Sequence, residues 1–156
     1  NILNSYYLHN EIRAKGGAYG AGITIARTGE MATYSYRDPN LKNTARVYDN
    51  IGEFVENLKI SNEDLKGFII GSMNAFDPLL SPGQIGDVNL SRYITGLKKD
   101  DLEKFKKEAL NTRIEKLNSY GEIFKKAMEK NYIAAFGSEN IIRDGKDLFK
   151  EIKSLR

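Results

Sequence analysis

The amino-acid sequence predicts an α+β fold, in which a mostly antiparallel sheet packs against several helices. Residues 18–27 and 31–37 alternate between apolar and polar side chains, which is typical of β-strands. Most of the remaining chain repeats its apolar residues at the spacing of an α-helix. The chain has 156 residues, 40% hydrophobic and 29% charged, and this is the size and composition of one globular domain.

A helix followed by a hairpin is expected at the start of the chain. Residues 2–13 carry an apolar stripe at helical spacing, and Gly16 and Gly17 follow it as glycine commonly follows a helix end. The segment RTGE separates the two strand patterns and indicates a turn. We therefore expect residues 18–27 and 31–37 to pair as an antiparallel hairpin.

The rest of the chain is predicted to be helical, apart from the short apolar run YIAAF at 132–136, which is predicted to be a buried strand. Several helices begin with a recognisable signal, either a capping box or a serine followed by proline. The predicted helices cover residues 41–58, about 61–75 with a capping box of Ser61 and Asp64, a segment opened by Ser81 and Pro82, about 99–110, about 112–130 with a capping box of Thr112 and Glu115, and 144–155.

The composition excludes several kinds of site. The sequence has no cysteine and a single histidine, His9, so it cannot build the common zinc sites, which need several His or Cys ligands. We interpret His9 as a surface or half-buried helix residue. The lysines alternate with acidic residues and the net charge is only +3, which is typical of solvated helix faces. We therefore expect no bound metal or cofactor in this chain, and no nucleic-acid or membrane partner.

The glycine-rich stretch EIRAKGGAYGAGITIA, residues 11–26, allows three interpretations. A phosphate-binding loop runs from strand to helix, whereas here a helix precedes the glycines and a strand follows. The second interpretation is structural: glycine caps the end of the helix because it adopts a positive φ without steric cost. Gly20 and Gly22 would then let another backbone or a helix lie close against the strand. Alternatively the turn brings Arg13 and Tyr19 into one neighbourhood, where they could bind a peptide carbonyl and donate to an oxyanion.

Three sequence blocks resemble one family. They are IRAKGGAYG, the pattern G-x-x-x-x-YSYRDPN at Gly29 to Asn40, and IIGSMNAFDPLLSPGQIG. In order and spacing they are similar to the C-terminal half of pitrilysin/insulinase family zinc metallopeptidases, in the form found in the presequence-protease (falcilysin-like) subfamily. The resemblance covers nearly the whole chain. The first two blocks are specific to the family, and the later helices are generic.

The resemblance implies a clamshell enzyme of two halves, each with two similar α+β domains of the LuxS/mitochondrial-processing-peptidase-like type. Residues 1–156 would be the fourth, C-terminal domain, incomplete at its N-terminal strands. The N-terminal half of such enzymes carries the zinc motif HxxEH and a downstream glutamate, and the C-terminal half binds no metal. Zinc would then be a cofactor of the parent enzyme, held by the absent N-terminal half.

By the same resemblance, Arg13 and Tyr19 match the residues that position the substrate and stabilise the tetrahedral intermediate across the chamber. The implied function is the non-zinc-binding C-terminal part of a zinc metalloendopeptidase that cleaves unstructured oligopeptides, with the isolated chain inactive. Its partners would be the N-terminal catalytic half and the peptide substrate. The alternative is a non-catalytic structural or partner-binding domain. For the localisation of the protein, the cytoplasm is favoured if the source is bacterial, and an organelle is the alternative if the source is eukaryotic.

Other residues have simpler interpretations. Arg37 and Asp38 are expected to pair locally and fix the end of the strand, with a place in the chamber wall as the alternative. Tyr34 and Tyr36, on one strand face, are predicted to pack in the core or against a helix. Asp77, with two nearby prolines, belongs to a loop between helices. If strands are missing, the exposed sheet edge favours self-association of the chain.

Overall fold

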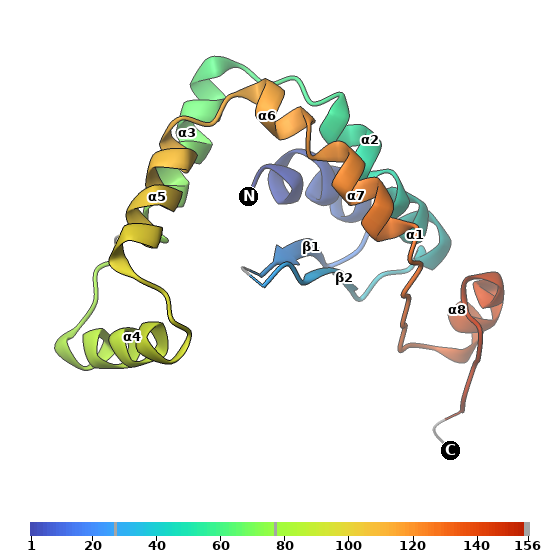
Figure 1. Cartoon of the computed structure of the whole chain (residues 1–156). Helices are drawn as coiled ribbons and strands as arrows, with labels where there is room; N and C mark the ends of the chain where they lie inside the picture. Colours follow the sequence, from blue (N-terminus) through green and yellow to red (C-terminus); the bar gives the residue numbers. More distant parts are fainter. Residues whose placement is uncertain (27, 77, 155–156) are drawn as a thin grey trace. The chain divides into compact units, whose positions relative to one another are not determined.

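The computed structural model describes residues 1–26, 28–76 and 78–154, and these residues form two compact units. The first unit consists of Asn1–Leu58 together with the described residues from Asn118 onward, and the second of Lys59–Leu117 (Figure 1). Only the first unit combines helices with a sheet. The α+β class predicted from the sequence is thereby confirmed.

The first unit is built on an antiparallel hairpin of strands β1, Gly20–Ile25, and β2, Met31–Tyr36. The two strands pair antiparallel, as predicted, and the register matches Gly20 with Tyr36 at one end and Ile25 with Met31 at the other. Arg27, the first residue of the predicted RTGE turn, lies outside the described residues. The helices of this unit are η1 (Leu3–Ala14), α1 (Leu41–Asp49), α2 (Ile51–Glu56), α7 (Gly121–Met128), α8 (Glu139–Asp144) and the single turn η2 (Lys146–Leu148).

The first helix, η1, is wound as a π-helix, in which amides bond to carbonyls five residues earlier. At its end, the Lys15 amide donates to the Asn10 carbonyl over 3.0 Å. Leu8 and Ile12, four residues apart, lie on the same face of the helix, and both side chains are fully buried. The helix predicted over residues 2–13 is therefore confirmed, although its hydrogen-bond pattern differs from that of an α-helix.

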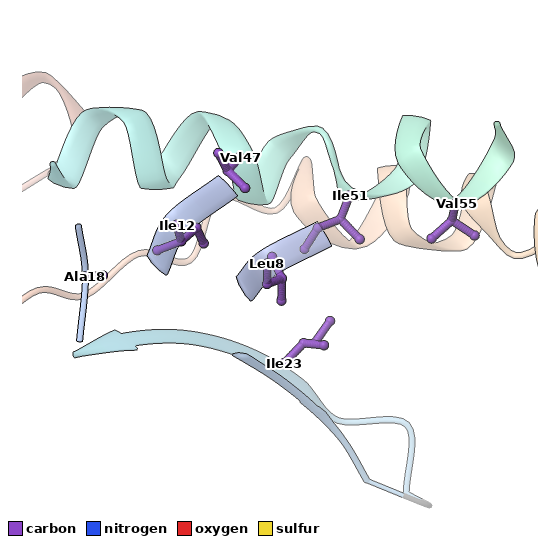
Figure 2. Packing of buried hydrophobic residues seen from close by; sticks show 7 residues of the cluster. All are labelled: Leu8, Ile12, Ala18, Ile23, Val47, Ile51 and Val55. Carbon is purple, nitrogen blue, oxygen red and sulfur yellow. The ribbon is translucent and has the colours of Figure 1, made fainter. Parts of the chain in front are cut away.

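The core of the first unit lies between η1, the hairpin and the α1–α2 segment. Figure 2 shows Leu8 and Ile12 between Ile23 of β1 and the side chains of Val47 and Ile51. Each such side chain, taken fully out of water, contributes about 1.5–3 kcal/mol. The amide side chain of Asn4 adds a polar link, because its Oδ1 accepts from the Ile23 amide over 2.8 Å.

Tyr7 of η1 ties this core to α1. Its hydroxyl donates to the Val47 carbonyl over 2.9 Å, and its ring stacks on Phe54 with centroids 4.4 Å apart. Burial, followed by the carboxylates of Glu11 and Glu53, raises the pKa of Tyr7 to about 12. The neutral phenol is thus the form that the folded state favours.

Helices α2 and α7 meet at two glycines. A methyl group on Gly52 would lie 2.8 Å from the Lys125 nitrogen and 2.9 Å from the Gly121 carbonyl oxygen, both of them backbone atoms. Lys125 also forms an ion pair with Glu56, with Nζ and Oε2 2.5 Å apart. The close approach of the two backbones joins the later part of the chain to the N-terminal core, and only glycine leaves room for it.

The second unit is helical and has a small core. In it, α3 (Asn62–Met73) packs against α5 (Lys99–Leu110). The other helices are α4 (Pro82–Ile94) and α6 (Ile114–Asn118), whose last residue already belongs to the first unit. Ser61 caps α3 by accepting from the Asp64 amide over 3.0 Å, so α3 begins where the sequence predicts. The Asp64 carboxylate accepts from the Ser61 hydroxyl over 2.7 Å and does not bond the Ser61 amide, so the predicted capping box is only half formed. Among the described residues of this unit, Leu65 is the only apolar residue that is buried. None of the helices described in either unit is both long and apolar enough to cross a membrane.

Two predicted helices are each interrupted. The helix predicted over 41–58 divides at Asn50, whose backbone leaves the helical region with φ −83° and ψ 1°. The helix predicted over 112–130 is replaced by the separate helices α6 and α7. Thr112 does not cap it, because the Thr112 hydroxyl donates back to the Glu108 carbonyl over 3.1 Å. The hydroxyl bonds to the preceding helix, as threonine side chains often do.

Two further predictions near the C-terminus are wrong. Residues 132–136, predicted to be a buried strand, are exposed and unpaired within the described structure. Five apolar residues without a neighbouring strand edge gain no ladder hydrogen bonds, so the run stays irregular. The helix predicted over 144–155 is also absent: α8 ends at Asp144, the first residue of that segment, and only the single turn η2 follows. Leu155, the last residue of that prediction, lies outside the described residues.

The prediction that Tyr34 and Tyr36 pack in the core is wrong as well. Their side chains are 52% and 56% exposed. Strand alternation places them on the hairpin face opposite Ile23, and it is the Ile23 face that the core covers. Tyr34 instead lies across Gly22, its cross-strand neighbour, where an added methyl group would meet the phenol oxygen at 2.6 Å.

Replacing Gly52 by alanine should destabilise the chain. The new methyl group meets backbone atoms of α7 that cannot rotate away, so we expect a loss of about 1–3 kcal/mol in the free energy of unfolding. Gly137→Ala is the control in the same unit, since an added methyl there meets no atom within 4 Å. Chemical denaturation followed by circular dichroism would measure both. Equal stability of the two variants would contradict the close contact of α2 and α7.

Stability should fall in strong alkali because of Tyr7. The folded state holds the phenolic proton more tightly than the unfolded chain, whose tyrosine pKa is about 10. The protonated Tyr7 phenol therefore contributes to the free energy of unfolding below about pH 10, and this contribution is lost as the pH rises towards about 12. Denaturation midpoints between pH 8 and 12 should therefore fall less steeply for Tyr7→Phe than for the unchanged chain. If the midpoints of the two proteins fell in parallel with pH, Tyr7 would have the same pKa in the folded and unfolded states, which would contradict this prediction.

Candidate functional site

The candidate site is the glycine turn that joins η1 to β1. Gly17 adopts the left-handed conformation with φ +79°, which glycine reaches without steric cost. The Gly17 amide donates to the Arg13 carbonyl over 3.0 Å, and the Ala18 amide to the Ile12 carbonyl over 3.1 Å. These bonds satisfy the last carbonyls of the helix, as a glycine cap does. The helix cap expected from the sequence is confirmed.

The turn does not offer its amides to an anion. The Gly17 and Ala18 amides are bonded within the cap, and the Tyr19 amide donates to the Tyr36 carbonyl over 3.1 Å. A phosphate cradle needs free amides at a helix N-terminus, and this turn follows a helix C-terminus. The glycines therefore shape the chain, and any chemistry here belongs to side chains.

Tyr19 presents its side chain to solvent at the entry of the hairpin. The side chain is 66% exposed, whereas its neighbour Ala18 is buried in the core. The Tyr19 and Tyr36 rings meet in a T-shaped arrangement, with centroids 6.1 Å apart and planes at 79°. Its hydroxyl makes no hydrogen bond to a residue that the structure describes. A phenol held at its ring and open at its oxygen can donate to a ligand.

Arg37 lies over both of these rings. Its guanidinium carbon is 5.8 Å from the centroid of Tyr19 and 5.4 Å from that of Tyr36. Both distances are within the range of a cation–π interaction. Arg37 makes no ion pair with Asp38, so the predicted local pair is wrong. The geometric reason is that Arg37 takes a positive φ of 48°, and its side chain turns towards the tyrosines.

Asp38 and Asn40 lock the segment after β2. Asp38 Oδ1 accepts from the Asn40 amide over 2.9 Å, which forms the turn that an Asp-Pro sequence predicts. Asn40 in turn donates through Nδ2 to the Gly16 carbonyl over 2.6 Å. The end of the hairpin is thereby tied directly to the glycine turn, 24 residues earlier in the chain.

Arg13 lies in the last turn of η1 and is exposed. Its backbone carbonyl is part of the glycine cap, but its guanidinium makes no hydrogen bond or ion pair with any residue described. Arg13 and Tyr19 thus stand at the two ends of the turn, and no hydrogen bond joins their side chains. Arg13 keeps all its donors for a ligand.

Other candidate residues stand apart from this site. His9 is exposed on η1, as expected for a surface helix residue. Asp77 lies outside the described residues. Among residues 1–26, 28–76 and 78–154, no group of three or more His, Asp or Glu side chains is arranged to hold a metal ion. The donor set present in the described chain therefore does not fit a zinc ion.

The sequence contained a signal for the role of Arg37 beside Tyr19. The pairing of Gly20 with Tyr36 places residue 37 opposite residue 19 by simple extension of the register. A hairpin centred on the RTGE turn predicts this neighbourhood. It does not predict the positive φ that directs the arginine onto the rings, because the alternating pattern carries no such information.

Comparison with known proteins gives a consistent result. The family model described as "PreP C-terminal domain" matches residues 1–139. Among curated proteins, "Protein HypA" of Clostridium perfringens is 37% identical over 155 residues, which is 99% of this chain and 16% of that protein. "Presequence protease 1, chloroplastic/mitochondrial" of Arabidopsis thaliana is 28% identical over 137 residues, 87% of this chain and 13% of that protein.

The mouse protein "Presequence protease, mitochondrial" is 26% identical over 140 residues, 89% of this chain and 13% of its own length. The chain thus spans about one sixth to one eighth of the length of these relatives.

Proposed function

Because the chain belongs to the PreP C-terminal domain family, a family of peptidases, we propose that it is the C-terminal part of a zinc metalloendopeptidase that cleaves unstructured oligopeptides. The observation that carries the proposal is the Tyr19 phenol, fixed at its ring and open at its oxygen, at one end of the glycine turn. Arg13, at the other end, supplies a free guanidinium. In this proposal both face the peptide substrate in the assembled enzyme.

Tyr19 would stabilise the tetrahedral intermediate. When water adds to the scissile carbonyl, the carbonyl oxygen becomes negatively charged. The Tyr19 hydroxyl can donate a hydrogen bond to that oxygen, and it needs no reorganisation because the ring is already held. One such donor is worth about 3–4 kcal/mol of transition-state stabilisation.

Arg13 would position the substrate. A guanidinium presents five N–H donors in a fixed fork, which suits peptide carbonyls and carboxylates. Because the carbonyls of a peptide backbone are the same whatever its sequence, such an anchor suits substrates of varied sequence. This role changes substrate binding more than the chemical step.

In this proposal, no residue of this chain binds the metal. The described residues contain no cluster that fits a zinc ion, so none of them is given the role of a ligand. The metal would be held by an N-terminal catalytic half that pairs with this chain. The alternative, a non-catalytic structural or partner-binding domain, differs in one respect: it gives Tyr19 and Arg13 no part in turnover.

Tyr19→Phe in the full-length enzyme should lower kcat by roughly 100- to 1,000-fold, because it removes one oxyanion donor. The ring and its packing are retained, so KM should change little. Steady-state cleavage of a fluorogenic peptide would measure both constants. Tyr132→Phe, which alters a side chain that is 90% exposed, is the matched control. Unchanged turnover in Tyr19→Phe would favour the non-catalytic alternative.

Arg13→Ala should raise KM by about tenfold, the effect of losing a charged hydrogen bond to the substrate, and should lower kcat less. The same peptide assay would measure it. Lys15→Ala, at the same exposed helix end, is the control. It removes only the ion pair with Glu11, at 2.6 Å, and exposed pairs of this kind contribute little. Equal kinetic effects of the two variants would remove the specific role of Arg13.

A further inference from the structure

We infer that Arg37 is a positioning residue, which holds the Tyr19 ring and so fixes the place of its phenolic oxygen. The inference rests on the proposed role of Tyr19 in turnover. It assigns a task to an arginine that belongs neither to the helix end nor to the glycine turn.

The geometry of three side chains carries the inference. The Tyr19 ring meets the Tyr36 ring in a T-shaped arrangement, at a centroid distance of 6.1 Å. The guanidinium of Arg37 lies 5.8 Å from the Tyr19 centroid and 5.4 Å from that of Tyr36. One cation therefore bridges two rings that already touch each other. An exposed phenol that would otherwise rotate about its side-chain bonds is restricted by both contacts.

The backbone of Arg37 provides a second, independent observation. Its φ of +48° lies in the left-handed region, which an arginine adopts only against a steric penalty. Glycine or asparagine would occupy this position more easily. The strained conformation is retained because the neighbouring segment is fixed on both sides. Before it, the Tyr36 carbonyl accepts from the Tyr19 amide, and after it, Asp38 accepts from the Asn40 amide.

Arg37 has no competing partner in the described structure. It forms no ion pair there, and even the adjacent carboxylate of Asp38 is directed to the Asn40 amide. Its positive charge is therefore available to the faces of the two tyrosine rings. Arg13, in contrast, forms no cation–π pair with either ring. The two arginines thus have different roles: Arg37 holds the Tyr19 ring, and Arg13 remains free to bind the substrate.

The experiment is a double-mutant cycle in the full-length enzyme. Arg37→Asn removes the cation but keeps a residue that tolerates a positive φ, so that the turn is preserved. Arg37→Lys keeps the charge and serves as the rescue variant. Each is combined with native Tyr19 and with Tyr19→Phe, and kcat, KM and the thermal midpoint are measured for every combination.

With Tyr19 present, Arg37→Asn should lower kcat roughly two- to tenfold with less than about a twofold change in KM, and Arg37→Lys should recover most of it. In the Tyr19→Phe background, Arg37→Asn should cause no further loss, since no hydroxyl remains to be positioned. Equal losses in both backgrounds, or a loss confined to KM, would overturn the inference alone. An unchanged kcat in Tyr19→Phe would instead overturn the proposed role of Tyr19 itself.

Discussion

The glycine cap at the end of η1 is the constraint on which the rest of the first unit depends. Gly17, at φ +79°, reverses the chain so that β1 runs back beneath the helix it has just left. That reversal brings Ile23 under Leu8 and Ile12, and the core forms around these three side chains. A residue with a Cβ at this position would meet the steric penalty of the left-handed region and would open the angle between helix and strand.

The same reversal determines the candidate site. Once β1 is placed, the hairpin register places the end of β2 beside Tyr19, and the Asn40 side chain closes the arrangement by donating to the Gly16 carbonyl at 2.6 Å. The site is therefore held by backbone geometry and by one amide side chain. Its polar backbone groups are already paired, which leaves the tyrosine hydroxyl and the arginines as the groups that can act on a ligand.

The sequence predicted those features that depend on local rules. The hairpin, the helix before it and the glycine cap follow from alternation, helical spacing and the conformational freedom of Gly17. The α+β class follows from their sum. The pair of Arg13 and Tyr19 was recognised from its sequence block, and its place at the two ends of the turn followed from the cap.

What the sequence could not predict depends on contacts between distant segments. Alternation shows that Tyr34 and Tyr36 share a face, but which face the core covers is decided by the packing of η1 on Ile23. Residues 132–136 have the composition of a strand and lack a partner for one in the described structure. The positive φ of Arg37 likewise follows from the locked turn after it.

The contrast between the two arginines shows why residue type alone does not assign a role. Arg13 and Arg37 are both exposed, and both carry a charge that no described carboxylate pairs. Arg13 stands exposed at a helix end, and its guanidinium makes no hydrogen bond or ion pair with a described residue, so in the proposed function it would follow substrates of different sequence. Arg37 is restricted by a strained backbone and two aromatic rings, so it can fix one atom in one place. Under the proposed function, a site that accepts varied peptides and stabilises a single transition state needs both properties, and here they come from two different elements, the end of η1 and the end of the hairpin.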